Sequence, residues 1–347
     1  MRGVISGVLR LRGKGFIAYS TLQSQALLGY GGGATRKFST RFSIRKPREA
    51  RAERVMISIG LFLPTTLTLP VRWKLALDGV TLSREIKPQV VVGAENAKYA
   101  RLVIDATPLL SQKFTERSVH SIFAFYDGAH PVTLADAFVV AAYSCEGSEY
   151  SVEYFTGAAS LEPGEIYKTY AQLGPSMGGS RSAVVSAHIP NPKSVMELVA
   201  GGSRRERIRG PGYRVARVEV PYRGSEIPVA IIYRRPETPL YPKTVIAGDI
   251  LVHENRIEGF ELKMERGEVS KSGGSYIVSL KLSNEGREEV RDIRIALTDT
   301  PGPAVIVERL QPGDSRSVTL KYLHSEPASV YIDAIVKGIR VYKEFRL

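Results

Sequence analysis

The sequence predicts an all-β protein made of two tandem β-sandwich domains behind a basic, disordered N-terminal arm. Helical periodicity is almost absent, and short alternating or β-branched segments follow one another with turn-forming residues between them. A pattern of Leu-x-Pro-Gly-acid followed by an alternating run also occurs twice, at residues 161–173 and 310–320. Many short strands separated by closely spaced turns are typical of β-sandwiches.

The arm, residues 1–55, holds most of the positive charge. It contains twelve Lys and Arg against only Glu49 and Glu53, a net charge of +10, whereas the rest of the chain has a net charge of +3. A disordered tail that contacts nucleic acid or anionic lipid fits this composition, and so does an acid-poor transit peptide. The third interpretation is a misplaced start, with Met56 as the true first residue, because a folded pattern begins there.

The most apolar segment, MISIGLFLPTTLTLPVRWK at residues 56–74, does not predict a membrane helix. Pro64 and Pro70 interrupt it, and its apolar run is shorter than the 18 or so residues that a span needs. We therefore expect an extended strand that enters the first domain, no membrane span, and a cytoplasmic protein. A location in the cell envelope is the alternative.

Strands are expected throughout the rest of the chain, with one exception. The expected strands cover residues 98–106, 121–127, 137–144, 213–222, 228–235, 276–283, 292–299, 317–323 and 329–336. The exception is residues 192–202, where Ser194 is a potential N-cap and Glu197 follows three residues later, which predicts a helix. A polar joint at residues 253–261 divides the body into an enlarged sandwich, 56–255, and a smaller one, 256–347.

The two Pro-Gly turns belong to a longer series of matches. A strand that ends in Glu-Gly precedes each turn, at residues 137–147 and 276–286, and a closing strand follows each, at residues 182–191 and 328–338. Pro fixes φ and Gly supplies a positive φ, so each turn reverses the chain tightly. Three landmarks in the same order predict a divergent duplication.

The C-terminal copy, residues 259–347, resembles the Ig-like β-sandwich modules of archaeal and bacterial adhesion-related proteins, the CARDB type. The residues that match this pattern are Asn284, Gly286, Leu310, Pro312 and Gly313. The resemblance implies a seven-stranded sandwich that serves as a spacer or binding surface and brings no active site. The first copy departs from the pattern because Cys145 stands where the pattern has Asn.

Candidate chemical groups in the sequence do not form a recognised motif. His120, Asp127, His130 and Asp136 lack the spacing of a known metal site, so we expect turn and surface roles, no metal and no cofactor. Cys145, the only cysteine, has no nearby nucleophile signature and is expected to be a structural thiol.

Two segments, one rich in Gly and Ser and one rich in Tyr, each have a structural and a binding interpretation. The Gly- and Ser-rich residues 174–182 fit a flexible loop better than a phosphate site, because no helix pattern follows them. The segment 143–170 contains five tyrosines, which either pack on strands or form a face that binds glycans or proteins.

The strongest charge run in the body is residues 203–214, which we expect to be an Arg-rich loop. Its five arginines are Arg204, Arg205, Arg207, Arg209 and Arg214. Only Glu206 opposes them, and arginine forks suit phosphates and carboxylates, so these residues are the predicted site for an acidic partner. A solvated connection between strands is the alternative interpretation.

These observations predict a non-enzymatic interaction or scaffold protein that binds an acidic protein or a polyanion. The first alternative is a nucleic-acid-associated factor that uses the Arg-rich segment and the arm, and the second is a hydrolase of glycans or peptides. A single cysteine excludes an internal disulfide, and only four Asn and six Gln, with abundant Arg, Glu and Val, indicate a hyperthermophilic archaeon.

Overall fold

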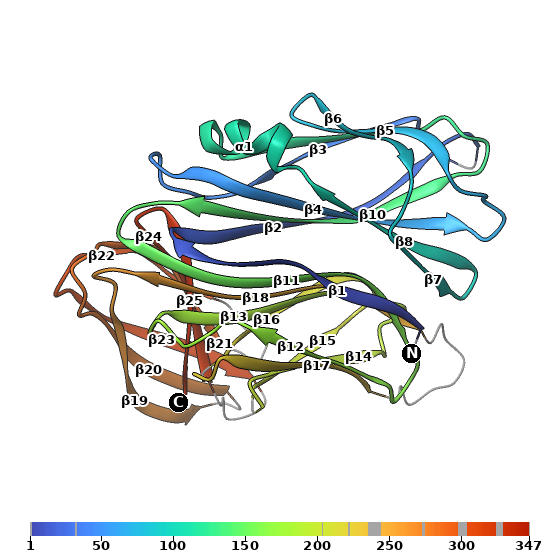
Figure 1. The fold of residues 1–347 in the computed structure, drawn as a ribbon. Helices are drawn as coiled ribbons and strands as arrows, with labels where there is room; N and C mark the ends of the chain where they lie inside the picture. Colours follow the sequence, from blue (N-terminus) through green and yellow to red (C-terminus); the bar gives the residue numbers. More distant parts are fainter. Residues whose placement is uncertain are drawn as a thin grey trace.

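The chain folds almost entirely into antiparallel β-sheets (Figure 1). The computed structural model describes residues 2–31, 33–202, 204–220, 223–234, 244–272, 275–297, 304–323 and 329–346. The prediction of an all-β protein is confirmed, and each segment expected to be a strand overlaps one within the described residues. In the described part of the chain, no helix has the length and apolar character that crossing a membrane requires.

The first two sheets enclose the N-terminal core. Sheet 1 contains, in order across the sheet, β3 (Lys37–Ser43), β9 (Val119–Phe125), β5 (Val71–Leu77) and β6 (Val80–Ile86). Sheet 2 contains β2 (Phe16–Leu28), β10 (Val132–Ser144), β4 (Arg51–Pro64), β8 (Ala97–Asp105) and β7 (Val90–Ala94). Helix α1 (Thr107–Glu116) begins with Pro108 in its first turn and buries Leu110 and Phe114.

The next two sheets form a second pair. Sheet 3 contains β1 (Arg2–Lys14), β11 (Ser148–Leu161), β18 (Val245–Ile257), β13 (Ser180–Ile189) and β16 (Gly212–Glu219). Sheet 4 contains β12 (Ile166–Gln172), β17 (Glu226–Arg234), β14 (Val195–Ala200) and β15 (Arg204–Arg209). Val185 of sheet 3 and Ile231 of sheet 4 are both fully buried in the core between them.

Sheets 1 to 4 stack in that order, so sheets 2 and 3 are covered on both faces (Figure 1). In β10, Val139 and Ala141 belong to the core shared with sheet 1, whereas Phe138 and Val140 pack toward sheet 3. Phe138 stacks on Tyr154 of β11 with ring centroids 5.7 Å apart. Burial on both faces explains why β10 is an almost continuous apolar run in the sequence.

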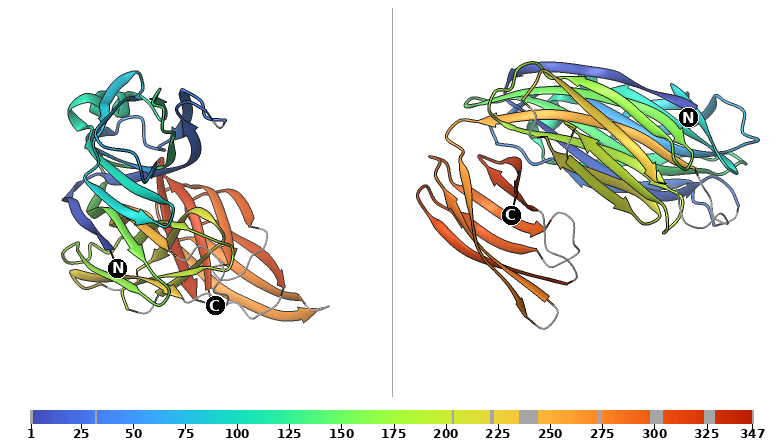
Figure 2. Two further views of the ribbon diagram at one scale, coloured as in Figure 1. Left: turned by 90° about the vertical axis from the view of Figure 1, so that its right-hand side faces the viewer. Right: turned by 90° about the horizontal axis from the view of Figure 1, so that it is seen from below.

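The C-terminal sheets 5 and 6 lie beside this stack (Figure 2). Sheet 5 contains β19 (Leu262–Ser272), β20 (Ser275–Asn284) and β23 (Ser315–Leu323). Sheet 6 contains β22 (Val305–Leu310), β21 (Val290–Leu297), β24 (Ser329–Val336) and β25 (Ile339–Arg346). Alternate apolar residues such as Leu280, Ile293 and Ile332 fill the core of this part.

The two Pro-Gly turns have the same geometry. Gly164 and Gly313 adopt φ values of +92° and +82°, and the next residue, Glu165 or Asp314, accepts a hydrogen bond on its carboxylate from the backbone N–H three residues earlier. Each turn carries the chain from one sheet of a pair to the other. The preceding landmarks differ, however, because β10 lies in sheet 2, outside the sheet pair that contains the first turn.

Asn284 ties the C-terminal turns together. Its buried side-chain amide donates hydrogen bonds to the backbone oxygens of Glu288 (2.8 Å) and Leu310 (3.1 Å), and its Oδ1 accepts one from the N–H of Gly286. The backbone N–H of Gly313 donates to the backbone oxygen of Asn284. The Asn-x-Gly and Leu-x-Pro-Gly landmarks thus have a structural role.

The prediction that the N-terminal arm is disordered is wrong. Residues 1–55 contribute β1, which pairs with β11, β2, which pairs with β10, and β3, which pairs with β9. Pairing on long partner strands buries the apolar residues that lie between the basic ones, such as Ile5 and Ile17. Met56 lies within β4.

The predicted helix at 192–202 is also wrong, because residues 195–200 form strand β14 between β15 and β17. Met196, Leu198 and Ala200 are fully buried, which is the two-residue period of a strand. Ser194 does not cap a helix; its hydroxyl shares a hydrogen bond with Tyr233.

Candidate anion-binding pocket

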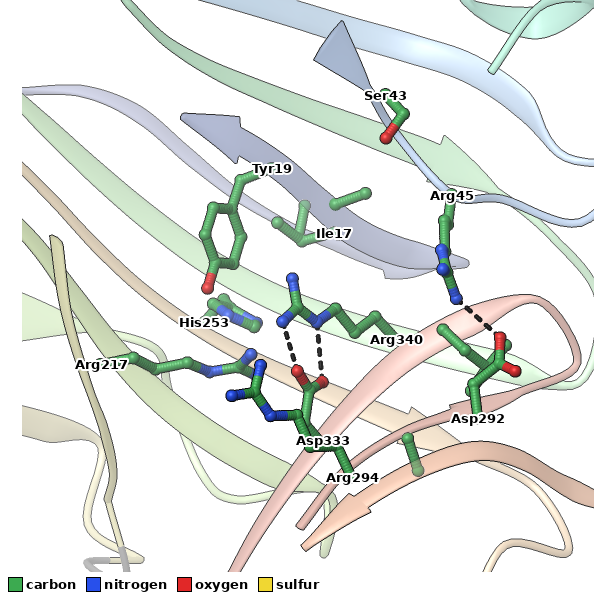
Figure 3. Close-up of a pocket in the computed structure, with 13 residues that line it drawn as sticks. Ile17, Tyr19, Ser43, Arg45, Arg217, His253, Asp292, Arg294, Asp333 and Arg340 are labelled. Atoms are coloured by element: carbon green, nitrogen blue, oxygen red, sulfur yellow. Dashed lines mark hydrogen bonds and ion pairs between the residues drawn. The ribbon is translucent and has the colours of Figure 1, made fainter. Parts of the chain in front are cut away.

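A cavity of about 370 Å³ lies where sheet 6 meets the four-sheet stack. Figure 3 shows its lining, which we call the junction pocket. Sheet 2 contributes Ile17 and Tyr19, sheet 3 contributes Arg217 and His253, and sheet 6 contributes charged residues from β21, β24 and β25. Arg45, just after β3, completes the wall.

Two of the four arginines in the junction pocket are neutralised. Arg340 donates two hydrogen bonds to Asp333, one of them from Nε to Oδ1 at 2.7 Å, in a two-point pairing across β24 and β25. This pairing raises the pKa of Arg340 above its ordinary value. Arg45 contacts Asp292 at 2.9 Å.

Arg217 and Arg294 have no ion-pair partner among the described residues. The guanidinium of Arg217 lies over the Tyr342 ring, 4.3 Å from its centroid, and its nearest polar contact from a side-chain nitrogen is a weak one of 3.5 Å to Ser182. The Nε of Arg217 is buried without a hydrogen-bond partner in the described part of the chain. Arg294 is exposed and points into the same space (Figure 3).

His253 is the second unsatisfied group in the pocket. It is only 4 % exposed, and neither ring nitrogen has a hydrogen-bond partner among the described residues. Burial and, next, the nearby positive charge of Arg217 lower the pKa of His253 to about 3. The imidazole is therefore neutral at pH 7, with one N–H to donate and one lone pair to accept a hydrogen bond.

The local sequence explains how these groups converge. Arg217 and His253 lie on β16 and β18, which both pair with β13, so their side chains stand on either side of that strand. On sheet 6, the register of β21 shifts between Arg291 and Arg294, and Asp292 adopts a φ of +48°. This bulge places Arg294 directly opposite Asp333 of β24.

The junction pocket therefore has an excess of two positive charges. It also holds three buried nitrogen atoms, Arg217 Nε and both ring nitrogens of His253, that lack partners in the described structure. Buried polar atoms are nearly always hydrogen-bonded in native proteins, so unpaired ones indicate a missing partner. A carboxylate or another oxyanion would accept hydrogen bonds from Arg217 Nε and from the single N–H of neutral His253, and it would bring the negative charge.

The predicted Arg-rich site lies elsewhere. Residues 204–209 form β15, the edge strand of sheet 4, and Arg214 lies on β16, so the expected loop consists of two strands joined by a short turn. Arg207 contacts Glu197 at 3.1 Å and Arg209 is exposed. The side chains of Arg204 and Arg205 lie outside the described residues. None of the three described arginines lines the junction pocket.

The predicted surface roles are wrong for two of the four His and Asp candidates. His120 is buried and bonds Asp78 at 2.7 Å through Nδ1, and Asp136 is completely buried between sheets 2 and 3. Asp127 and His130 are exposed, as expected. No group of His, Cys, Asp and Glu in the described structure is arranged to hold a metal ion.

The Gly- and Ser-rich segment 174–182 does bind an anion, but this anion is the carboxylate of Glu254, a residue of the protein itself. The backbone N–H groups of Met177 and Gly179 and the hydroxyl of Ser176 all donate to one oxygen of the buried Glu254 carboxylate. Arg181 binds the other oxygen at 2.7 Å. These donors are therefore not open to an external phosphate.

Cys145 and the tyrosines fit structural roles. Burial raises the pKa of the half-buried Cys145 thiol, which is the opposite of what a reactive cysteine needs. Four tyrosines of the segment 143–170 are buried on strands, namely Tyr143, Tyr150, Tyr154 and Tyr167. Only Tyr170 is exposed.

Comparisons with known proteins add little. No protein-family model and no curated protein matches the sequence. Among solved structures, PNGase F, a glycosylasparaginase from Flavobacterium meningosepticum, is similar over 70 % of this chain and 99 % of its own, with 7 % identity and a TM-score of 0.28. The glycoside hydrolase domain of Endo-D from Streptococcus pneumoniae R6 covers 56 % of this chain and 33 % of its own, with 6 % identity and a TM-score of 0.19. Scores this low support no conclusion about function.

Proposed function

We propose that this chain is an interaction protein that binds an acidic protein partner through the junction pocket. The observation that carries this proposal is the set of unpaired buried nitrogens on Arg217 and His253, next to the uncompensated charge of Arg294. An aspartate or glutamate side chain of the partner would accept hydrogen bonds from Arg217 and from the N–H of His253, because guanidinium forks match carboxylates in shape and charge.

The C-terminal sheets take part in this site. We propose that sheets 5 and 6 form an Ig-like module, and this module contributes Arg294, Arg340 and Asp333 to the pocket. Its role would then be to complete the binding surface. The volume of the pocket, about 370 Å³, lies near the lower end of the range of about 300–1,000 Å³ that is usual for ligand sites, which suits one or two side chains.

Fluorescence anisotropy with labelled poly-L-glutamate tests the proposal. Because Arg294 has no partner within the described structure, Arg294→Gln should leave stability unchanged and weaken binding about tenfold, the loss of one charged hydrogen bond. The matched control is Arg316→Gln, which removes an exposed arginine on sheet 5 and should bind as the parent does.

A second comparison separates the pocket from the Arg-rich strand. The double variant Arg207→Gln/Arg209→Gln should retain binding to poly-L-glutamate. If this variant loses binding while Arg294→Gln retains it, the acidic partner binds at β15 and the pocket assignment is wrong. A short DNA duplex that binds more tightly than poly-L-glutamate, with a steep salt dependence, would favour the nucleic-acid alternative instead.

A further inference from the structure

A second cavity, of about 440 Å³, lies between sheets 2 and 3 and shares no lining residue with the junction pocket. We call it the His188 cavity. Its polar lining residues include Ser24, Gln25, Thr133 and Thr244, and Phe62 provides an aromatic face. The described residues that line it include no Lys or Arg, so its chemistry differs from that of the junction pocket.

His188 of β13 reaches this cavity in a defined orientation. Its Nε2 lies 2.7 Å from Oδ2 of Asp136, whose carboxylate is completely buried. The rings of Phe62, Tyr99 and Tyr213 surround the imidazole at centroid distances of 5.1–5.3 Å. Such packing restricts the orientation of the ring.

The contact with Asp136 also fixes the tautomer of His188. Burial alone would raise the pKa of Asp136, but the Arg101 charge and the His188 hydrogen bond outweigh burial and hold the pKa well below its ordinary value. An ionised carboxylate only accepts hydrogen bonds, so Nε2 must carry the proton. Nδ1 of neutral His188 therefore has a lone pair, and no described residue donates to it.

Asp136 is itself held rigidly. Tyr99 donates to its Oδ2 at 2.7 Å, and Arg101 pairs with its Oδ1 and reaches Asp249 at 3.2 Å. The register of β10 shifts at Asp136 against both neighbouring strands, and the opposite residue is Gly60, where any side chain would collide with the Asp136 carboxylate. Bulges of this kind re-aim a side chain and are common next to functional sites.

From this arrangement we infer a second, hydrolytic site: His188 acts as a general base toward water, and the His188 cavity holds an uncharged ester-type molecule with polar substituents. Nδ1 takes a proton from the water as its oxygen bonds to the acyl carbon. The bond from that carbon to the leaving oxygen then breaks, and the proton passes to the leaving oxygen. Asp136 is the positioning residue, because it fixes the tautomer of His188 without touching the substrate.

Hydrolysis of p-nitrophenyl acetate, a small uncharged ester, tests this inference on the intact chain. His188→Gln should lower the second-order rate constant at least tenfold, because a general base typically contributes a factor of about 100–10,000. His130→Gln is the matched control, since His130 is exposed and outside the cavity. The His188 cavity and the junction pocket share no lining residue, so this test is independent of the proposed acidic partner.

The tautomer of His188 can be measured in the parent protein, so this second test does not require that a variant folds. In ¹⁵N NMR spectra of the parent protein with His188 in its neutral form, Nε2 should be protonated and Nδ1 bare. Asp136, Arg101, Tyr99, Tyr213 and Glu95 are the ionisable groups on the elements that face His188. A proton on Nδ1, or an ester hydrolysis rate unchanged in His188→Gln, would overturn the inference.

Discussion

Replacing Arg101 with methionine is expected to destabilise the protein by about 3–5 kcal/mol at pH 7, the usual cost of leaving buried charges without their partner. The side chain of Arg101 is 1 % exposed and lies between Asp136 and Asp249, both of which are completely buried. Methionine fills a similar volume, so the loss comes from electrostatics and not from a cavity.

The pH dependence of this loss has a definite sign. With Arg101 present, the pKa of Asp136 in the folded protein lies below its ordinary value, so the carboxylate contributes stability that is complete above about pH 4 and is lost below it. Without Arg101, burial would dominate and raise the folded pKa above the unfolded one. The variant should therefore be most destabilised at neutral pH, and the difference from the parent should shrink as pH falls toward about 4.

Guanidinium denaturation at pH 7 and pH 4.5 measures both effects. The matched control is Arg256→Met, because Arg256 and Glu149 form an ion pair in which both side chains are about half exposed, and such pairs contribute at most about 1 kcal/mol. Adding Asp136→Asn to Arg101→Met should restore part of the stability. A loss below about 1 kcal/mol at pH 7, or a loss that increases on acidification, would refute the electrostatic reasoning.

Two further predictions concern the other buried polar groups. Asn284→Ala should lower the free energy of unfolding by about 2–3 kcal/mol, because the backbone oxygen of Leu310 loses its amide donor, whereas Gln311→Ala at the exposed neighbouring turn should change it little in the same denaturation assay. The depressed pKa of His253, about 3, means that the parent loses stability as pH falls from about 6.5 toward 3, and His253→Gln should flatten that part of a stability-against-pH curve; a parallel curve would contradict the burial of a neutral imidazole beside Arg217.

The strands of the body could be predicted because their local pattern and their tertiary environment agree. The segments 276–283 and 329–336 alternate in the sequence and alternate in burial. The N-terminal segment misled because its basic residues dominate its composition, while its strand character depends on pairing with β10 and β11, more than a hundred residues away. Residues 192–202 were predicted as a helix because they contain a potential N-cap and helix-forming residues. The alternation of Met196, Leu198 and Ala200, which indicates a strand, received less weight.

The junction pocket could not be predicted, because it collects residues from segments that are distant in the chain. Only one local signal was present: His253 follows the apolar residues 250–252 within β18, a position at which the strand must bury a polar group. Asp136 gave the same signal within β10 and was interpreted as a surface residue. A polar residue inside a strand that is buried on both faces is therefore a signal separate from the charge run at residues 203–214.

Charge balance decides what each part of the layer between sheets 2 and 3 can do. At its centre, Arg101 has two buried carboxylates, so the cation is fully matched and has no capacity for an external anion. At one margin, Arg217 has none among the described residues. Burial and, next, the charge of Arg217 lower the pKa of His253, so both groups could contact the proposed acidic partner. At the other cavity, Asp136 accepts hydrogen bonds from both Arg101 and His188, and the proposed role of His188 as a base depends on this contact. The proposed anion site and the proposed base therefore differ in whether the buried arginine beside each has a carboxylate partner.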